Sequence, residues 1–445
     1  MLDRLLGSVT PCPCGTTHVV TTRRVAVRRG ALAELGPMAR GLDLAGPALV
    51  VADPDTWAAA GAGAVESLAH TGLTVRTLVL DAHPVAGPEG VAQVVAHVGD
   101  AGLLVAVGAG TVNDLVKSAA TACALPYLAV GTALSMNGYT SSISALLEGG
   151  VKRTLPATPP LGVVLDLDVC AAAPRTMTLA GLGDMLSKPF SEADWRLSAH
   201  VDRVPYCARP GAVLEDAFAR MVAAAAGIGR AEPTALAHLS EALLLSGMSM
   251  AMAGTSAPAS GGEHLISHYW DMMRYGMGAH PYALHGTQVG VACCLVEPLH
   301  RSVQALRGRS LRTSDLDALL ADWPTTLDGL RSRVRACHTE LPPDVVDGVV
   351  AEAAKKWRPP EAQRVRLESI AENLDPILAD VGAALLPDGA IRQALRDAGA
   401  PTTAAEIDPS LAGDLVRWAK VRDIRARYTI LDFAAELGAL TEGAR

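Results

Sequence analysis

The first part of the chain alternates between short apolar runs and alanine-rich or amphipathic segments. The apolar runs predict strands at residues 47–52, 75–80, 103–107, 127–130 and 163–166. The segments between them predict helices at residues 57–69, 90–98 and 112–121. Alternation of strands and helices is typical of a parallel sheet covered by helices on both faces. The pattern therefore predicts an α/β fold for this part of the chain.

The pattern changes at about Leu179, where long Ala/Leu-rich periodic segments replace the β-branched runs and predict helices. Breaks in this helical region are expected at residues 209–211, 257–262 and 358–360. A chain of 445 residues is too long for one ordinary core. We therefore predict two domains, a parallel-sheet domain of residues 1–178 and an α-helical domain of residues 179–445.

The composition is that of a compact globular protein, with 50% hydrophobic and 19% charged residues. A net charge of −8 and only 4% aromatic residues argue against a nucleic-acid partner. The N-terminus lacks the apolar segment of a secretory signal, and the longest uncharged run, residues 118–147, contains Pro126 and Asn137, unlike a membrane-spanning helix. We expect a cytoplasmic protein without a membrane partner, whose eight cysteines are free thiols.

Small residues follow the predicted strand at residues 103–107. At Gly108, Gly110 and Thr111 a phosphate could approach the backbone N–H groups at the start of the next helix. The motif is weak, because Asn113 stands where a dinucleotide fingerprint has its third glycine. In the same helix, Asp114 and Lys117 are either active-site groups or an ordinary surface pair.

Two further strand ends carry polar residues. Asp53 follows the first predicted strand, where an acid can bind a ribose hydroxyl or cap the next helix. The hydroxyl-rich loop of residues 131–142, with Thr132 and Ser135, either holds a phosphate or nicotinamide ribose or is turn chemistry alone.

Residues 260–295 hold four of the twelve histidines. His264 and His268 share one face of a predicted helix, and His285 stands at the expected start of another. Far upstream, Asp184 is expected at a helix start, where a capping role is the simpler interpretation. One Asp and two His with an open position describe a catalytic divalent metal site.

Cys12, Cys14 and His18 form a second group with metal-like spacing, in the segment CPCGTTH. Three potential ligands without a fourth nearby do not make a closed zinc site. We therefore interpret this segment as a structural turn.

Six blocks, in order along the chain, carry a family resemblance. They are VAVGAGTVNDLVKSAA, GTALSMNGYTSSISAL, GLGDMLSKPFSEADWRL, SGGEHLISHYWD, ALHGTQVGV, and the tail LRDAGAPTTAAEI with RDIRARYTILDFAAELG. Together they resemble the sn-glycerol-1-phosphate dehydrogenase family, especially its longer bacterial form. That family belongs to the superfamily of iron-containing alcohol dehydrogenases, glycerol dehydrogenases and dehydroquinate synthases.

The resemblance implies a Rossmann-like N-terminal domain, an all-α C-terminal domain and an active site in the cleft between them. It also implies one divalent metal, zinc most often and nickel or iron as alternatives, held by Asp184, His264 and His285. His268 would then be a catalytic neighbour that contacts the substrate. Lys117 and Lys188 would be the candidates for the substrate phosphate, with Lys188 also counted among the catalytic residues.

The resemblance further implies that NAD(P)H binds to the N-terminal domain. The residues implied are Gly108, Gly110, Thr111 and Asp114 under the dinucleotide, Asp53 near the adenosine, and Thr132 and Ser135 near the phosphates or nicotinamide.

Two positions depart from the family pattern. Asn137 stands where the family commonly has Asp, and Thr287 where it commonly has Glu. Asn keeps the shape and accepts hydrogen bonds, but it cannot act as a base. Asn137, which we expect at the substrate, therefore permits a changed substrate.

The expected protein is an NAD(P)H oxidoreductase that interconverts dihydroxyacetone phosphate and sn-glycerol 1-phosphate, a homodimer in phospholipid metabolism. The alternatives are a dehydrogenase for another polyol, hydroxyketone or sugar phosphate, a dehydroquinate-synthase-like cyclase, and a silent metabolite-binding protein.

Overall fold

The computed structural model describes residues 1–148, 151–413 and 415–439. They form two compact units. The first comprises Met1–Met185, Cys207–Pro258 and Ala394–Ala400, and the second comprises Leu186–Tyr206, Ala259–Gln393 and Pro401–Arg445. The units differ from the predicted division at residues 178 and 179, because the helices of Cys207–Pro258 pack with the first unit. It remains a prediction that residues 1–178 bind the nucleotide and that residues 179–445 bind the metal and substrate.

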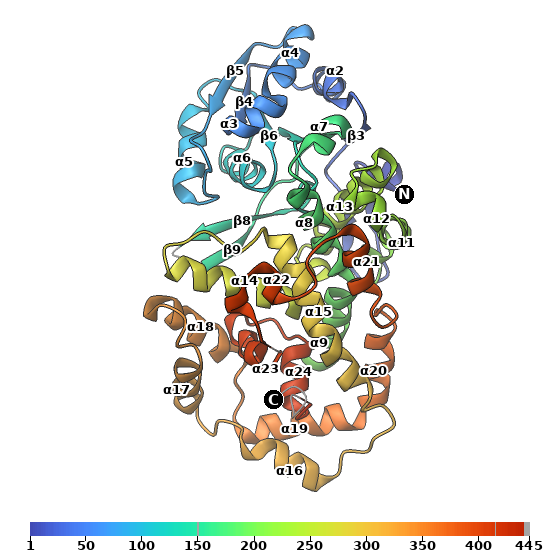
Figure 1. The fold of residues 1–445 in the computed structure, drawn as a ribbon, viewed down its shortest axis with the longest axis vertical. Helices are drawn as coiled ribbons and strands as arrows, with labels where there is room; N and C mark the ends of the chain where they lie inside the picture. Colours follow the sequence, from blue (N-terminus) through green and yellow to red (C-terminus); the bar gives the residue numbers. More distant parts are fainter. Residues whose placement is uncertain (149–150, 414, 440–445) are drawn as a thin grey trace. The chain divides into compact units, whose positions relative to one another are not determined.

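The first unit is built on a six-stranded sheet in the order β3-β10-β7-β6-β4-β5 (Figure 1). All neighbouring strands are parallel. The strands are β3 (Arg24–Arg28), β4 (Ala48–Ala52), β5 (Val75–Val79), β6 (Leu103–Gly108), β7 (Tyr127–Gly131) and β10 (Gly162–Asp166). The predicted α/β fold is confirmed, and the prediction missed only the edge strand β3 of this sheet.

The central strands are buried because their sequences are continuous apolar runs. β4, β6, β7 and β10 are buried at every position, as expected for parallel strands covered on both faces. On one face, Val50, Val105 and Val164 join Leu35 and Leu68 in one core cluster. The covering segments are η1 (Ala31–Glu34), α2 (Leu35–Gly41), α3 (Pro54–Thr56), the π-helical turn η2 (Trp57–Gly61), α4 (Ala62–His70), α5 (Pro88–His97), α6 (Gly110–Ala122) and α7 (Leu167–Ala172).

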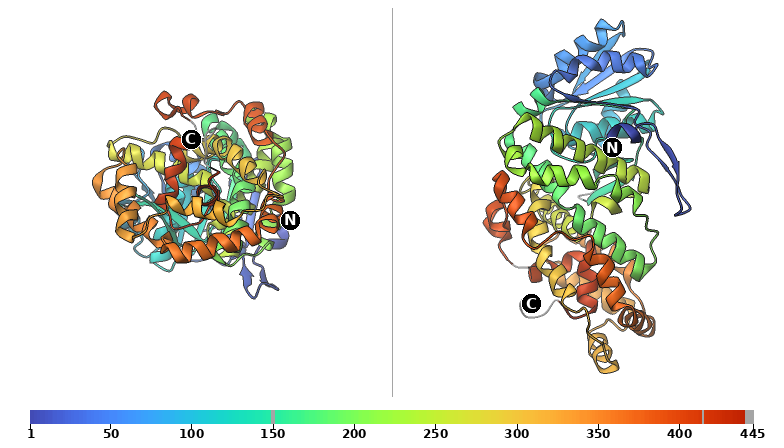
Figure 2. Two further views of the ribbon diagram at one scale, coloured as in Figure 1. Left: turned by 90° about the horizontal axis from the view of Figure 1, so that it is seen from below. Right: turned by 90° about the vertical axis from the view of Figure 1, so that its right-hand side faces the viewer.

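Two antiparallel hairpins in the first unit were not predicted. They are β1 (Val9–Pro11) with β2 (Thr17–Val19), and β8 (Ile143–Glu148) with β9 (Val151–Pro156). The β1–β2 hairpin follows α1 (Leu2–Leu5) and projects as a dark blue ribbon in both views of Figure 2.

Helix α13 (Pro233–Ala253) is the longest helix of the first unit. It is long and apolar enough to cross a membrane, but 78% of its most apolar window is buried inside the protein, as in the core helix of a soluble domain. It packs against β2, β3 and α7. The remaining helices that lie mainly in this unit are α8 (Arg175–Leu186), α10 (Arg209–Ala212), α11 (Glu215–Ala223), α12 (Ala225–Gly229) and α21 (Ala390–Ala398), and η3 (Ala257–Ala259) follows α13.

The second unit is helical throughout its described residues, as predicted for this region. Its helices begin with α9 (Lys188–Asp202), α14 (Gly262–Gly276), α15 (His285–Gln304), α16 (Thr313–Ala321) and α17 (Leu327–Cys337). They continue with α18 (Pro343–Lys356), α19 (Pro360–Glu372), α20 (Leu374–Gly382), α22 (Ala404–Ile407), η4 (Pro409–Leu411), α23 (Leu415–Trp418), η5 (Ala419–Ile424) and α24 (Ile430–Glu436). The predicted breaks before α14 and α19 are confirmed, whereas the one at residues 209–211 is wrong, because these residues form α10.

Candidate nucleotide and metal sites

The first unit contains a topological switch point between β4 and β6. These strands are neighbours, but the chain continues from β4 to β5 on one side, while β7 and β10 follow β6 on the other. In open α/β sheets, ligands bind beyond the carboxyl ends of the strands at such a point. Asp53 follows β4 directly, and Gly108 is the last residue of β6, so two predicted cofactor positions stand at this point.

The glycines after β6 make a tight turn into α6. A Cβ atom at Gly108 would lie 2.6 Å from Val112 Cβ, so a side chain does not fit there. At Gly110, the first residue of α6, the nearest atom to an added Cβ is Met136 Cγ at 3.7 Å. The helix therefore starts with accessible backbone at Gly110 and Thr111, and its N-terminal N–H groups favour an anion.

Asp53 caps the helix that follows β4. Its Oδ1 accepts hydrogen bonds from Thr56 N at 2.8 Å and from Thr56 Oγ1 at 3.0 Å. The capping interpretation of Asp53 is therefore confirmed, whereas a contact with ribose stays a prediction.

Lys117 holds the loop that follows β7. Its side chain is fully buried, and its Nζ donates to Gly138 O at 2.6 Å, Ser141 Oγ at 3.1 Å and Ile143 O at 3.0 Å. Asp114 lies one turn earlier, with Oδ1 3.9 Å from Lys117 Nζ and Oδ2 accepting from Ala145 N at 3.3 Å. The alternative of an ordinary surface pair is therefore wrong, because both residues tie α6 to the loop and the β8–β9 hairpin.

The buried Lys117 gives stability a measurable pH dependence. Burial lowers the pKa of Lys117 from 10.5 to about 8, although the nearby Asp114 opposes the shift. Between these two pH values the unfolded chain keeps a proton that the folded chain has released, so stability rises with pH. Relative to Lys117→Met, the free energy of unfolding of the unaltered protein should increase by about 3 kcal/mol from pH 7 to pH 10.5, as measured by urea unfolding. A constant difference between the two proteins would contradict this ionisation.

Thr132 and Ser135 lie in the same loop. Thr132 is 5% exposed, and its backbone N donates to Gly108 O at 3.3 Å, which joins the ends of β6 and β7. Ser135 is half-buried. The loop is further fixed by Tyr139, whose hydroxyl donates to Ala133 O at 2.7 Å.

Asp184 is paired with Asn137 in the first unit. Asn137 donates from its backbone N to Asp184 Oδ2 at 3.1 Å and from Nδ2 to Oδ1 at 3.4 Å. Asp184 is only 2% exposed. The expected position at a helix start is wrong, because α8 begins at Arg175 and Asp184 lies in its last turn, where it cannot cap the helix. Gly181, one turn earlier, packs on the Asn137 loop so closely that an added Cβ would lie 1.9 Å from Leu134 O.

In the second unit, the structure brings together the three predicted histidines. His264 and His268 lie on one face of α14, with ring centroids 6.1 Å apart, and His285 is the first residue of α15. The His285 ring lies 5.2 Å from that of His264 and stacks on that of His268 at 5.4 Å. Three imidazoles from two helices thus face one another.

Two residues that the sequence analysis missed orient these rings. His264 Nδ1 lies 2.8 Å from Glu263 Oε1, and His285 Nδ1 lies 3.1 Å from Ser267 Oγ. With Nδ1 protonated and donating, each ring presents the Nε2 lone pair, as metal-binding histidines do. Burial opposes the ionisation of Glu263, but hydrogen bonds from His264 and from Gly261 N keep the pKa of its carboxyl below the ordinary value.

Glu263 could not be identified from the spacing alone. Adjacent residues on a helix normally point to different sides. Here Glu263 stands in the first turn of α14, and its side chain folds back to accept from Gly261 N at 2.8 Å. The only signal in the sequence is the carboxylate next to His264.

The start of α14 is fixed by two residues of α9. Asp194 Oδ2 accepts from Gly262 N at 2.7 Å, and its Oδ1 accepts from Ile430 N at 2.7 Å. Lys188 is 6% exposed, and its Nζ donates to Ala259 O at 3.2 Å and to Ser187 Oγ at 3.4 Å. The predicted substrate residue Lys188 thus lies beside the segment that leads into the histidine helix.

The fold is shared with solved structures named as glycerol and alcohol dehydrogenases. A family model described as iron-containing alcohol dehydrogenase matches residues 26–174. A probable glycerol dehydrogenase from Sinorhizobium meliloti aligns with a TM-score of 0.59 and 18% identity, over 94% of this chain and 96% of that chain. An iron-containing alcohol dehydrogenase from Thermotoga maritima aligns with a TM-score of 0.51 and 15% identity, over 95% of this chain and 99% of that chain. The chain therefore has the fold of the iron-containing alcohol dehydrogenase class.

Curated relatives define the family more narrowly. A glycerol-1-phosphate dehydrogenase (NAD(P)+) from Halalkalibacterium halodurans is 35% identical over 57% of this chain and 64% of its own length. One from Haloarcula marismortui is 34% identical over 71% of this chain and 86% of its own length. The chain thus spans less than two thirds of the first relative and most of the second. It belongs to the glycerol-1-phosphate dehydrogenase family, as the sequence blocks predict.

Proposed function

We propose that this protein is a metal-dependent NAD(P)H oxidoreductase that interconverts dihydroxyacetone phosphate and sn-glycerol 1-phosphate. The observation that carries the proposal is the 34% identity to a glycerol-1-phosphate dehydrogenase over 71% of this chain. The switch point of the first unit supports nucleotide binding, and the histidine group of the second unit supports metal binding.

In this proposal, Asp184, His264 and His285 hold one divalent metal. A carboxylate and two imidazoles suit zinc, nickel and iron, with zinc the most common choice for such a set. The fit is supported by Glu263 and Ser267, which engage Nδ1 of the two histidines and leave Nε2 for the metal. When bound, the metal supplies Lewis-acid stabilisation of the charge that develops on the substrate oxygen. His268, stacked on His285, contacts the substrate and helps move its proton.

The nucleotide is proposed to lie at the switch point of the first unit. The start of α6 at Gly110 and Thr111 would hold its phosphates, and Thr132 and Ser135 would line the loop beside it.

Lys188 is the better candidate for the substrate phosphate. The Lys117 ammonium makes three hydrogen bonds to the loop that it holds. Lys188 Nζ donates to Ala259 O at 3.2 Å and to Ser187 Oγ at 3.4 Å. A charged lysine that is 6% exposed also gains more from a phosphate partner than an exposed one does.

Asn137 favours a second candidate, a dehydrogenase of the same class with another polyol, hydroxyketone or sugar phosphate as substrate. Its Nδ2 donates to Asp184, so this residue positions the carboxylate and cannot serve as a base. A proton relay through this position is therefore excluded for any substrate.

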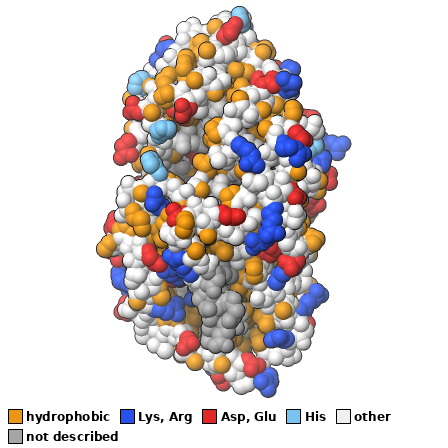
Figure 3. Space-filling view, viewed as in Figure 1, with side chains coloured by type: hydrophobic (Ala, Val, Ile, Leu, Met, Phe, Trp, Pro, Cys, Tyr) orange, Lys and Arg blue, Asp and Glu red, His pale blue; other side chains and the backbone are white. Residues whose placement is uncertain are grey.

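We further propose a cytoplasmic homodimer in phospholipid metabolism, with a small phosphorylated carbonyl compound as its partner and neither nucleic acid nor membrane. On the face shown in Figure 3, Lys and Arg side chains are interspersed with Asp and Glu, so this face offers no uniformly basic area for a polyanion.

The test is a carbonyl-substrate screen on protein whose metal content has been measured. With dihydroxyacetone phosphate, we expect consumption of NADH or NADPH, followed by its ultraviolet absorbance. In the reverse direction, sn-glycerol 1-phosphate should be oxidised and sn-glycerol 3-phosphate should not. Turnover with another carbonyl compound alone would favour the second candidate. Cyclisation without net use of the nucleotide, or nucleotide binding without turnover, would refute both.

A further inference from the structure

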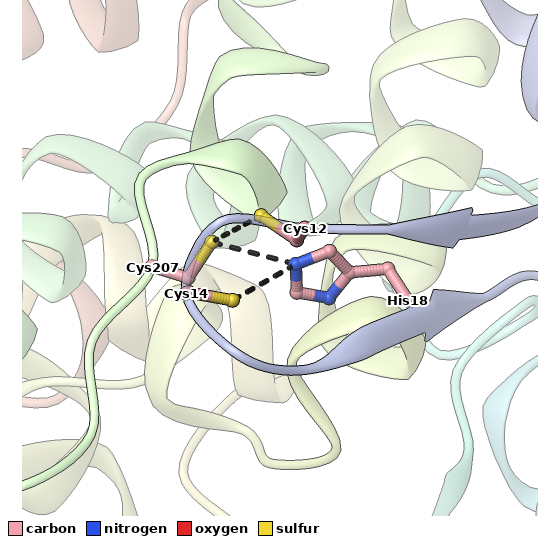
Figure 4. Close-up of side chains that lie close together, drawn as sticks. All are labelled: Cys12, Cys14, His18 and Cys207. Atoms are coloured by element: carbon pink, nitrogen blue, oxygen red, sulfur yellow. Dashed lines mark hydrogen bonds between the residues drawn. The ribbon is translucent and has the colours of Figure 1, made fainter.

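The first unit contains a second group of metal-binding side chains, made of Cys12, Cys14, His18 and Cys207 and here called the cysteine cluster (Figure 4). Cys12 and Cys14 lie in the turn between β1 and β2, and His18 lies on β2. Cys207 follows 195 residues after Cys12, in the segment that precedes α10. The three Sγ atoms and His18 Nε2 all lie within 4.8 Å of one another.

Three distances within the cysteine cluster match those of a tetrahedral zinc site. With Zn–S bonds of about 2.3 Å and a Zn–N bond of about 2.0–2.1 Å, a tetrahedron has S···S edges of about 3.8 Å and S···N edges of about 3.6 Å. The Sγ atoms of Cys12 and Cys207 are 3.7 Å apart. His18 Nε2 lies 3.6 Å from Cys14 Sγ and 3.4 Å from Cys207 Sγ. These three distances match the edges of a zinc tetrahedron, and the other donor pairs lie within 4.8 Å.

His18 is held in the tautomer that metal binding needs. Its Nδ1 lies 2.7 Å from Met252 O near the end of α13, to which it donates. This hydrogen bond leaves the Nε2 lone pair directed at the sulfur atoms. His18 is only 3% exposed. Its imidazole is therefore fixed by a hydrogen bond to a backbone carbonyl that is shielded from water.

The hairpin that carries three of the donors has little apolar support of its own. β1 and β2 have three residues each, and their valines are exposed, Val9 at 66% and Val19 at 39%. An isolated two-stranded hairpin is marginally stable in water. A metal bound to Cys12, Cys14 and His18 and to the distant Cys207 would fix the hairpin to its unit, as structural zinc ions do in small domains.

We propose that the cysteine cluster is a closed structural zinc site, separate from the metal held by the histidines of the second unit. Three thiolates and one imidazole fill all four positions, so this ion has no place for water or substrate and takes no part in the reaction. The interpretation of CPCGTTH as a structural turn was incomplete, because the fourth ligand stands far away in the sequence.

The test counts metal per chain in the full-length protein expressed with zinc. We expect two equivalents in the unaltered protein and one in Cys14→Ser, where a ligand is lost. Cys337→Ser is the matched control, because Cys337 is exposed like Cys14 but lies outside the cluster, and it should keep both equivalents. His264→Ala should also hold one equivalent. If the histidine site bound no metal, the unaltered protein would hold one equivalent and Cys14→Ser none. If the cysteine cluster bound no metal, the unaltered protein would hold one equivalent and His264→Ala none.

Cobalt identifies the donors directly and does not depend on any variant. Cobalt-loaded unaltered protein and His264→Ala should both show the thiolate-to-cobalt charge-transfer absorption of a sulfur-rich tetrahedral site, whereas Cys14→Ser should lose most of it. Absence of this absorption in the unaltered protein would overturn the proposal, even if Cys14→Ser does not fold. A disulfide between Cys12 and Cys207 in protein prepared with zinc, detected by mass spectrometry of peptides, would also overturn it.

Discussion

His264→Ala is expected to remove the active-site metal and to lower turnover roughly 10³-fold or more, because Lewis-acid stabilisation is worth several kcal/mol in the transition state. The orientation of His264 is fixed, since Glu263 Oε1 holds its Nδ1 at 2.8 Å and both side chains are buried. Alanine also removes one of the hydrogen-bond donors to the buried carboxylate of Glu263. Metal analysis and the carbonyl assay on the same preparation measure both effects.

His268→Ala is the matched control for this change. His268 lies one turn further along α14 and belongs to the same ring group, but it is predicted to touch the substrate and not the metal. It should keep its full metal content while losing turnover. If His264→Ala kept a full complement of metal, or if His268→Ala lost as much as His264→Ala, the assignment of ligands on α14 would be wrong.

Asp194→Ala is expected to lower the free energy of unfolding by about 3 kcal/mol or more, because it strips two buried N–H groups of their acceptor at about 1–3 kcal/mol each. Asp194 is 2% exposed and accepts from the first residues of α14 and α24, both at 2.7 Å. Burial and the nearby Glu263 raise the pKa of Asp194, so the expected loss comes from the two hydrogen bonds alone. Urea unfolding of the two proteins measures the difference.

Asp408→Ala provides the comparison. Asp408 also accepts a backbone hydrogen bond at the start of a helical turn, from Ser410 N at 2.8 Å, but the contact is exposed to water. Its replacement should cost about 1 kcal/mol or less, since water replaces the lost acceptor. Equal losses for the two variants would show that Asp194 acts as an ordinary surface cap.

Most strands that the sequence predicted have continuous apolar runs, and β5, the other edge strand, was found despite its interrupted pattern VRTLV. β4, β6, β7 and β10 lie in the middle of the sheet, where burial on both faces demands such runs. β3 has only three apolar residues, between arginines at its two ends, and the β1–β2 hairpin has too few residues for any periodic signal. The apolar pattern did not reveal β1, β2 and β3, which are strands because they pair with a neighbouring strand and not because they are buried along their whole length.

The residues of the candidate sites also differ in whether the sequence alone reveals them. The glycine turn at Gly108 and the spacing of His264 and His268 are local features, so the sequence displays them. The burial of Lys117, the hydrogen bonds of Asn137 to Asp184 and the position of Cys207 depend on residues brought together by the fold. Glu263 lies between these cases, since it is adjacent to His264 but faces it only because the helix starts there.

The position of β3 at the edge of the sheet has a consequence for synthesis on the ribosome. β3 is made early but pairs only with β10, the last strand of the sheet to be made. Cys12 and Cys14 can meet Cys207 only later, after that residue has emerged from the ribosome. Contacts between such distant segments form late and leave the growing chain exposed. A nascent chain that ends before β10 therefore carries an unpaired β3, and one that ends before Cys207 carries two thiols without their distant partner.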